Sequence, residues 1–282
     1  MVTLKRIKFK ETDNSNNGTA PKDLLNKVST HQTDADKDFK TLRVLSYNIH
    51  KGFSPNNSRY ILNEIRHAIR LVNADVIFLQ EVLGDNNKHH RKHSNWIPGA
   101  QFEFLADEVW PHFAYGKNAI YQQGHHGNAI LSKYPFNFWE NTDISRFSFS
   151  KRGILHGTIG ENVHVICMHV GLLGMERRSQ IKALVETVET KVPNDAPLII
   201  AGDFNDWKGS VDRRLRKQLG VSEAFREVSG KLARTFPAAL PIFQLDRIYV
   251  RNLAVQDVSC LVDDHWQKLS DHCALYAELS LN

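Results

Sequence analysis

Apolar residues form two matching strand–helix–strand patterns along the chain. The first has apolar runs over residues 42–50 and 75–82, and the second over residues 163–169 and 198–206. Between the runs, apolar residues recur at the three- and four-residue spacing of an amphipathic helix: Ile61, Ile65, Ala68, Ile69 and Val72 in the first pattern, and Ile181, Leu184, Val185, Val188 and Val192 in the second. Because a helix joins the two strands of each pattern, we expect those strands to pair in parallel or to lie close together.

Local signals give the expected ends of the helices. Ser58 is a candidate N-cap for the first helix, since a serine side chain can accept a hydrogen bond from the first turn. Pro193 and Pro197 end the second helix and lead into the next strand. A further helix is expected over residues 102–109, and Pro111 prevents it from continuing.

Other segments predict antiparallel strands. Residues 129–132 form a short strand before a Tyr134-Pro135 break, and residues 275–281 alternate between apolar and polar or small side chains. Residues 153–159 and 162–169 are joined by Gly160-Glu161, which predicts a hairpin. A mixture of helix crossovers and hairpins predicts an α/β fold with mixed sheets rather than a fully parallel sheet.

The chain divides into a polar arm and one domain. Residues 1–41 are rich in Asn, Asp, Lys, Thr and Ser without apolar periodicity, so we expect a flexible polar N-terminal arm there. No linker interrupts residues 42–282, which predicts a single catalytic domain. The arm lacks the apolar stretch of a signal peptide or membrane span. The cysteines, Cys167, Cys260 and Cys273, lack metal-ligand spacing and are expected to be free thiols of a cytoplasmic protein.

Charge and aromatic content narrow the choice of partner only slightly. The chain has 36 Lys and Arg against 31 Asp and Glu, a balance that suits an anionic substrate. The basic run at residues 213–217 is typical of a solvated helix face. Trp96, Trp139, Trp207 and Trp266 are expected mainly in the core, although exposed members could contact bases or a lipid surface.

Polar residues stand at the ends of the four apolar runs. Asn48 and Glu81 end the runs of the first pattern, and His169 and Asp203 end those of the second at nearly the same separation. Open α/β sheets place their ligand sites beyond the carboxyl ends of the strands. A carboxylate in such a position is costly unless it is paired, hydrogen-bonded or bound to a metal. These residues therefore predict one polar site suited to a metal ion and a phosphate.

Further acids and histidines follow, each with a plainer alternative. Glu81 alone could be a surface residue at a strand end, and Asp206 could simply cap or solvate a turn. Asp246 lies in an apolar strand and could form a salt bridge with Arg247. A lone histidine such as His272 is by default an ordinary hydrogen-bonded side chain.

Six motifs, taken in order, resemble the endonuclease/exonuclease/phosphatase superfamily, which includes deoxyribonucleases, repair nucleases, neutral sphingomyelinases and inositol-polyphosphate 5-phosphatases. The motifs are Asn48-Ile49-His50, Gln80-Glu81, His169, Gly202-Asp203-Phe204-Asn205, Leu245-Asp246-Arg247-Ile248 and Ser270-Asp271-His272. Residues 48–53, 124–132 and 234–237 look like the uncharacterised bacterial branch encoded beside cardiolipin synthase. The resemblance implies a deoxyribonuclease-like four-layer α/β sandwich, with two mixed sheets face to face, helices outside and the active site at one edge.

The resemblance also implies a metal site. Glu81 would be the chief ligand of Mg²⁺ or Mn²⁺, ions that prefer carboxylate oxygen and water. Asn48 would support the metal or a phosphate oxygen, and Asp271 would provide a second acidic contact.

Catalytic and phosphate-binding roles follow from the same resemblance. Asp203 would orient or deprotonate the attacking water, and Asn205 and His169 would donate hydrogen bonds to the phosphoryl oxygens. His272, oriented by Asp246, would be a general base or a phosphate donor. Both Asp203 and His272 remain candidates for the proton acceptor. The residues expected around the substrate phosphate are His50, Lys51, Arg152 and His126.

The implied activity is metal-dependent phosphodiester hydrolysis by in-line attack of water. The substrate would be a nucleic acid or a phospholipid headgroup. The near relatives' gene neighbourhood favours lipid, with peripheral membrane contact, and the breadth of the superfamily favours nuclease. No long basic insert suited to gripping duplex DNA is evident. A phosphomonoesterase is the enzymatic alternative. A non-catalytic binding module is a second alternative, disfavoured because the acids and amides of the motifs are all retained.

Overall fold

The computed structural model describes residues 40–86, 95–121 and 124–281. The chain divides into two units, Met1–Asp38 and Phe39–Asn282, and the second contains the two sheets and their helices. The predicted N-terminal arm, residues 1–41, therefore lies almost entirely outside the described residues.

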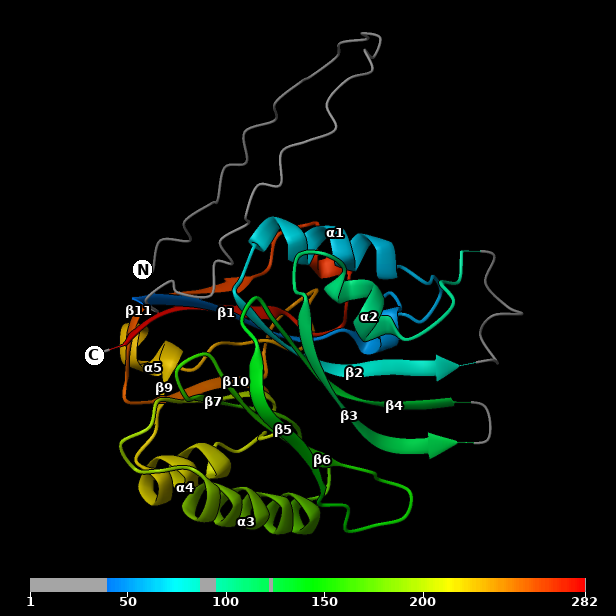
Figure 1. Cartoon of the computed structure of the whole chain (residues 1–282). Helices are drawn as coiled ribbons and strands as arrows, with labels where there is room; N and C mark the ends of the chain where they lie inside the picture. Colours follow the sequence, from blue (N-terminus) through cyan, green and yellow to red (C-terminus); the bar gives the residue numbers. More distant parts are fainter. Residues whose placement is uncertain (1–39, 87–94, 122–123, 282) are drawn as a thin grey trace, which may run out of the picture. The chain divides into compact units, whose positions relative to one another are not determined.

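Two six-stranded sheets form the centre of the fold (Figure 1). Sheet one has the order β11-β12-β1-β2-β4-β3, and sheet two has the order β5-β6-β7-β8-β10-β9. Their strands are β1 (Thr41–Asn48), β2 (Val76–Asn86), β3 (His112–Tyr121), β4 (Gly124–Ser132), β5 (Phe136–Asp143), β6 (Gly153–Ile159), β7 (Val163–His169), β8 (Leu198–Asp203), β9 (Ser222–Glu223), β10 (Asp246–Arg251), β11 (Leu253–Leu261) and β12 (Ala274–Leu281). The pairs β1–β2 and β7–β8 are parallel, whereas β6–β7 and β1–β12 are antiparallel. The predicted mixed sheets are confirmed.

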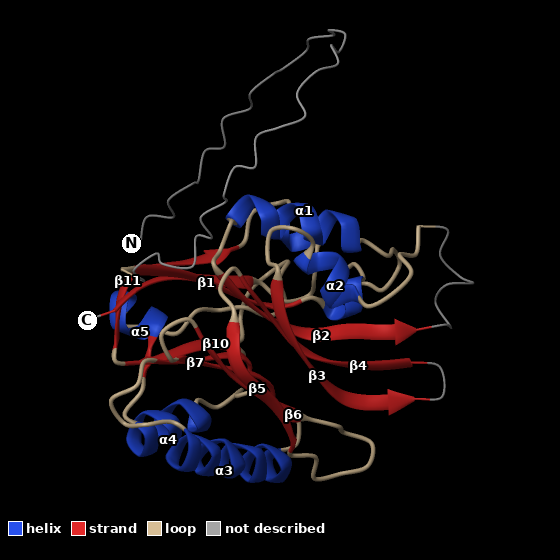
Figure 2. Cartoon of the chain, in the orientation of Figure 1, coloured by secondary structure: helices blue, strands red, loops and turns tan. Residues whose placement is uncertain are grey.

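Helices cover the outer faces of both sheets (Figure 2). Helices α1 (Leu62–Val72) and α2 (Gln101–Ala106) lie over sheet one, and α3 (Gly174–Lys191) and α4 (Ser210–Leu219) lie over sheet two. The remaining helices are α5 (Ala224–Ser229) and the 3-10 turns η2 (His50–Gly52) and η3 (Trp266–Lys268). The four-layer sandwich expected from the sequence is thus confirmed. Among the described helices, none is long and apolar enough to cross a membrane.

Three apolar clusters hold these layers together. The central cluster joins the two sheets and includes Val44 and Phe78 from sheet one and Val165 and Ile248 from sheet two, all fully buried. A second cluster packs the α1 stripe against sheet one, and a third packs the α3 stripe against sheet two. Each fully buried side chain of this kind contributes about 1.5–3 kcal/mol. The strands of both βαβ units are therefore buried on both faces, which explains their nearly continuous apolar runs.

Several element boundaries differ from the prediction. Ser58 is not the N-cap of the first helix: α1 begins at Leu62, and the Ser58 hydroxyl instead donates to Asn56 Oδ1 over 2.6 Å. The helix expected to reach residue 109 ends at Ala106, because Asp107 turns the backbone to a φ of 45°. The β6–β7 turn also includes Asn162, at a φ of 69°, a conformation that asparagine tolerates better than most residues.

The alternative prediction for Asp246, a salt bridge with Arg247, is wrong. Consecutive residues of a strand point to opposite faces of the sheet, so these two side chains diverge. Arg247 is fully buried and its Nη2 lies 3.7 Å from Asp206 Oδ2. The Asp206 carboxylate also accepts hydrogen bonds from the backbone N–H groups of Ser210, Val211 and Asp212 at the start of α4. Asp206 therefore caps α4, as its plainer interpretation held, and anchors the segment that follows β8.

A charged clamp aligns β1 and β2. Asp75, just before β2, accepts hydrogen bonds from the backbone N–H of Arg43 at 2.9 Å and from its guanidinium at 2.8 and 3.0 Å. Lys133 Nζ lies 3.1 Å from the same carboxylate. Burial alone would raise the pKa of Asp75, but the Arg43 hydrogen bonds and the Lys133 charge outweigh it and lower that pKa. The clamp therefore stabilises the pairing of the two strands that carry Asn48 and Glu81.

Replacing Asp75 by Asn should destabilise the protein in a pH-dependent way. The pKa of the folded state lies below the unfolded value of about 3.9, so the carboxylate stabilises the fold above that pH and the contribution is lost as the pH falls. We expect urea denaturation to show a loss of about 2 kcal/mol at pH 7 that shrinks toward pH 3. Asp195→Asn, at an exposed turn, is the control and should change little. An equal loss at both pH values would show that the clamp does not work through the charge of Asp75.

Candidate active site

The polar residues predicted from the sequence meet at one edge of the two sheets. The strand pairing places Asn48 opposite Gln80, His169 opposite Asp203, and Asp203 opposite Asp246. This edge, called the site edge below, comprises the ends of β1, β7 and β8, the middle of β2 at Gln80 and Glu81, and the starts of β10 and β12.

Asp203 contacts side chains that both sheets contribute. Its Oδ2 lies 3.3 Å from Asn48 Nδ2, 3.5 Å from His169 Nε2 and 3.8 Å from His272 Nε2. Its Oδ1 accepts a hydrogen bond of 2.9 Å from the backbone N–H of Asn205. Asp203 is almost fully buried. The Asp203 carboxylate therefore lies close to an amide from sheet one and to two imidazoles.

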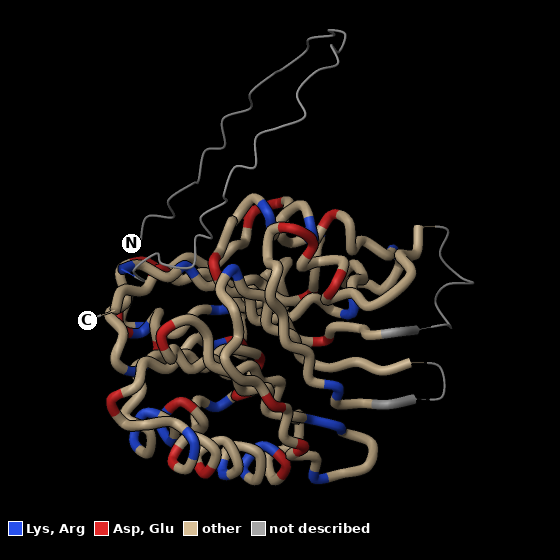
Figure 3. The backbone as a smooth tube through the Cα atoms, viewed as in Figure 1, with Lys and Arg blue, Asp and Glu red and all other residues tan. Residues whose placement is uncertain are grey.

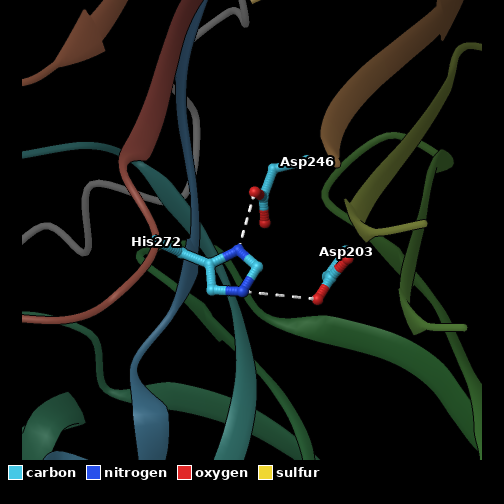
Figure 4. Close-up of side chains that lie close together, drawn as sticks. All are labelled: Asp203, Asp246 and His272. Carbon is cyan, nitrogen blue, oxygen red and sulfur yellow. Dashed lines mark hydrogen bonds and ion pairs between the residues drawn. The ribbon is translucent and has the colours of Figure 1, made fainter. Parts of the chain in front are cut away.

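Asp246 and His272 form the hydrogen-bonded pair that the sequence predicts. His272 Nδ1 lies 2.8 Å from Asp246 Oδ2, and its Nε2 faces Asp203 (Figure 4). Burial alone would lower the pKa of His272, but the nearby charges of Asp246 and Asp203 raise it to about 10. Burial and the Asp246 charge raise the pKa of Asp203, against the opposing effect of His272. His272 is therefore an imidazolium at neutral pH, held between two carboxylates.

Two buried hydroxyl groups position this pair. Thr235 Oγ1 accepts hydrogen bonds from the backbone N–H groups of Leu245 and Asp246, each 3.2 Å long. Ser270 Oγ donates to the backbone carbonyl of Asn48 over 2.7 Å and accepts from the backbone N–H of His272 over 3.2 Å. The motifs at residues 234–237 and 270–272 contain both residues, but their positioning roles depend on contacts that the sequence does not reveal.

Glu81 owes its position to a break in the strand. The β2–β4 pairing shifts register between Leu79 and Val82, and Glu81 adopts a φ of 56°. Such a bulge re-aims a side chain, and the unusual φ costs about 1–3 kcal/mol. Burial alone would raise the pKa of Glu81, but the charges of His169 and Lys51 lower it to about 2. Lys51 Nζ lies 3.0 Å from Glu81 Oε2.

The remaining predicted residues surround this centre. The His50 backbone N–H donates to Asn48 Oδ1, and His50 Nδ1 lies 3.7 Å from Asp271 Oδ1. His50 and Asp271 therefore both lie beside Asn48. Burial and the Arg152 charge lower the pKa of His169 to about 4. Burial and the Lys51 charge likewise lower the pKa of His126 to about 4. Both imidazoles are therefore neutral at neutral pH, in a region of positive potential suited to a phosphate.

Two groups of side chains could hold a metal ion. Ligand atoms of Asp203, Asp246 and His272 lie within 4.8 Å of one another, a spacing that can hold one. Their mutual hydrogen bond, however, already occupies His272 Nδ1 and Asp246 Oδ2. The second group centres on Glu81, whose carboxylate is paired with Lys51 through Oε2. An ionised carboxylate in this position fits a hard divalent cation, which would take the place of the Lys51 ammonium group as its charged partner.

Comparison with known proteins identifies the family. The Endonuclease/Exonuclease/phosphatase family model matches residues 45–272. The uncharacterized protein YbhP of Escherichia coli K12 is 44% identical over 246 residues, which cover 86% of this chain and 97% of YbhP.

Solved structures share the fold at low identity. An endonuclease/exonuclease/phosphatase from Beutenbergia cavernae has a TM-score of 0.69 at 19% identity, covering 86% of this chain and 72% of its own. D. rerio TDP2 complexed with a single-strand DNA product has a TM-score of 0.64 at 18% identity, covering 85% and 99%. The family match and the identity to YbhP show that the chain belongs to the endonuclease/exonuclease/phosphatase family, whose members are typically hydrolases of phosphoester bonds.

Proposed function

We propose that this protein is a metal-dependent phosphodiester hydrolase in which water attacks phosphorus in line. The arrangement around Asp203 carries the proposal. A buried carboxylate faces two imidazoles and an amide, the charge of Arg152 acts on one of those imidazoles, and Lys51 is paired with Glu81. Such a site can orient water, donate hydrogen bonds to phosphoryl oxygens and balance the developing negative charge.

The proposed catalytic roles follow from the hydrogen-bonding groups that each side chain still has available for the substrate or for water. His272 is fixed by Asp246 through Nδ1, so its Nε2–H is directed into the site and can donate to a phosphoryl oxygen. We therefore propose that Asp203, rather than His272, orients the water and accepts its proton. Asn205 uses one amide hydrogen on the Val170 carbonyl and keeps a second for a phosphoryl oxygen. His169 would supply a further donor.

Metal binding is assigned to the oxygen-rich group. Glu81 would be the main ligand, with Asn48 and Asp271 in support, and Mg²⁺ or Mn²⁺ suits such hard oxygen donors. The bound ion would stabilise charge that develops on the phosphoryl oxygens. Asp203, Asp246 and His272 are assigned to water and proton handling, because their hydrogen bonds already pair them.

The positively charged side chains would bind the substrate phosphate. Arg152 Nε is buried without a hydrogen-bond partner among the described residues, and an unpaired guanidinium N–H suits a phosphate oxygen. Lys51, His50 and His126 would complete this group. A phosphomonoesterase would use the same residues and differ only in the leaving group, so it remains the enzymatic alternative.

A nucleic acid and a phospholipid headgroup are the two proposed substrate classes. The D. rerio TDP2 complex with single-stranded DNA product supports the former by analogy of fold. Peripheral contact with a membrane would accompany the latter. All three cysteines are free, in keeping with the proposed cytoplasmic location. A non-catalytic module is disfavoured, because burying Asp203 and Asp246 together would be a costly arrangement to keep without use.

Glu81→Gln should abolish most metal-dependent turnover while the protein stays folded. The amide keeps the shape of the side chain but removes the charge that would bind the cation. We expect turnover of a soluble diester in Mg²⁺ to fall about 100-fold or more. Glu64→Gln, on the exposed side of α1, is the matched control. Unchanged turnover in Glu81→Gln would remove Glu81 from the metal site.

Asp246 and His272 should behave as one unit in a double-mutant cycle. Asp246→Asn and His272→Ala disable the same hydrogen-bonded pair, so their losses should be strongly non-additive. We expect each single variant to lose about 100-fold or more in kcat, and the double variant to lose no more than about tenfold beyond the worse single variant. Turnover at a fixed metal concentration measures this, and independent, multiplying losses would contradict the pairing.

The N-terminal arm should be dispensable for the chemistry. The described domain begins with β1 at Thr41, and residues 1–41 lack apolar periodicity. A chain that starts at Thr41 should fold, as judged by circular dichroism, and retain turnover of a small diester within about twofold. Loss of folding would show that the arm packs against the domain.

A further inference from the structure

Exposed apolar side chains are concentrated beside the site. Of the thirteen large hydrophobic residues exposed in the described chain, eight lie in four segments that leave the site edge of sheet two. These segments, called the apolar rim, are residues 144–152, 170–175, 204–209 and 230–245. Their most exposed members are Phe149, Leu172, Met175, Leu240 and Ile242, between 53% and 77% exposed. Exposed apolar groups gathered in this way mark an interaction surface rather than random scatter.

The four segments adjoin one another. Strands β6, β7, β8 and β10 are consecutive neighbours in sheet two, so their ends at this edge span only about 15 Å. Asn205 Nδ2 donates to the Val170 carbonyl over 2.8 Å, which joins the second and third segments. The Trp207 and Phe243 rings, 4.7 Å apart, join the third and fourth. Ile144 packs against the cluster that contains Val170, which joins the first.

The apolar rim is continuous with the reacting groups. The Phe236 ring lies 4.9 Å from the His272 imidazole and 6.2 Å from Trp207, which is 41% exposed. An aromatic path therefore runs from the proposed phosphate donor to the exposed surface. A substrate with an apolar part could place its phosphate at His272 while that part rests on the rim.

The apolar rim carries a net positive charge. The four segments contain six basic residues: Arg146, Lys151, Arg152, Lys208, Lys231 and Arg234. Asp206, their one acid, is buried and caps α4. Figure 3 shows basic residues along the segment that joins β5 to β6. A surface that combines exposed apolar side chains with an excess of basic ones complements an anionic lipid interface.

We propose that the apolar rim docks on an anionic phospholipid bilayer and presents a membrane-lipid phosphodiester to the site. This inference rests on the proposed function and selects its lipid substrate. Five of the eight exposed rim residues are aliphatic, among them Leu172, Leu240 and Ile242. Single-stranded nucleic acid is held by aromatic stacking platforms, whereas aliphatic side chains offer no ring face to a base. Acyl chains and the headgroup boundary accept aliphatic side chains readily.

Vesicle flotation of the full chain tests the docking surface. The protein is mixed in EDTA with vesicles of phosphatidylcholine alone or of phosphatidylcholine with phosphatidylglycerol. We expect binding to the anionic vesicles and weaker binding when NaCl is raised, because salt screens the basic groups. Leu172→Ser with Leu240→Ser should weaken binding by about tenfold or more. Leu71→Ser with Val228→Ser removes side chains 49% and 48% exposed on α1 and α5, and should change binding less than about twofold.

The outcomes separate docking from catalysis. Equal losses in the two double variants, or none in the rim variant, overturn the proposal. Tighter binding to a single-stranded oligonucleotide, lost in the rim variant, also overturns it and assigns the surface to nucleic acid. Wild-type hydrolysis of bis(p-nitrophenyl) phosphate in Mg²⁺ tests the proposed function separately. Hydrolysis without vesicle binding rejects the rim alone, and vesicle binding without hydrolysis rejects the function. For the rim variant, the ratio of vesicle to soluble hydrolysis should fall about tenfold.

Discussion

The contact between Asn48 and Asp203 is the constraint on which the site depends. An amide at the end of β1 and a carboxylate at the end of β8 meet across the two sheets at 3.3 Å. A buried carboxylate is costly unless hydrogen bonds and opposite charges surround it. Asp203 obtains hydrogen bonds from the Asn48 amide on sheet one and from the backbone N–H of Asn205, and the opposite charge comes from His272. The packing of one sheet on the other therefore fixes the geometry of the reacting groups. A shift of either sheet would change the distances between those groups.

The sequence predicts the fold better than it predicts the details of the site. Apolar runs separated by an amphipathic helix are enough to give the parallel pairs, because burial on both faces leaves few other arrangements. Asn48, His169, Asp203, Asp246 and His272 are brought together as expected, since strand ends on one edge converge. The bulge that turns Glu81 has no sequence signal, and the end of α2 depends on a single backbone angle at Asp107. The pairing of Arg247 with Asp206 rather than Asp246 follows from strand alternation, a rule that the salt-bridge alternative neglected.

Exposure is the property that the sequence predicts least well here. Tryptophans are usually core residues, and Trp266 is indeed 8% exposed, but Trp139 and Trp207 are 47% and 41% exposed. Leu172 and Leu240 look equally suited to a core when only their neighbours in sequence are considered. Whether an apolar residue in a connecting segment meets the core or the solvent depends on how the strand ends are spaced, and that is settled only when the sheet is assembled. The apolar rim could therefore be found only in three dimensions.

The pairing of β1 with β12 determines when the site can exist. Thr41 lies opposite Ser280, so the first described strand completes its sheet with the last one. Asp271 and His272 stand directly before β12, and the carbonyl of Asn48 is held by Ser270. Contacts between such distant parts of a chain form late, because a long loop must close first. The residues up to β10 can assemble sheet two, but His272 reaches Asp203 only when β12 has paired with β1. Sheet two alone would therefore hold Asp203 and Asp246 without the imidazole that faces both of them.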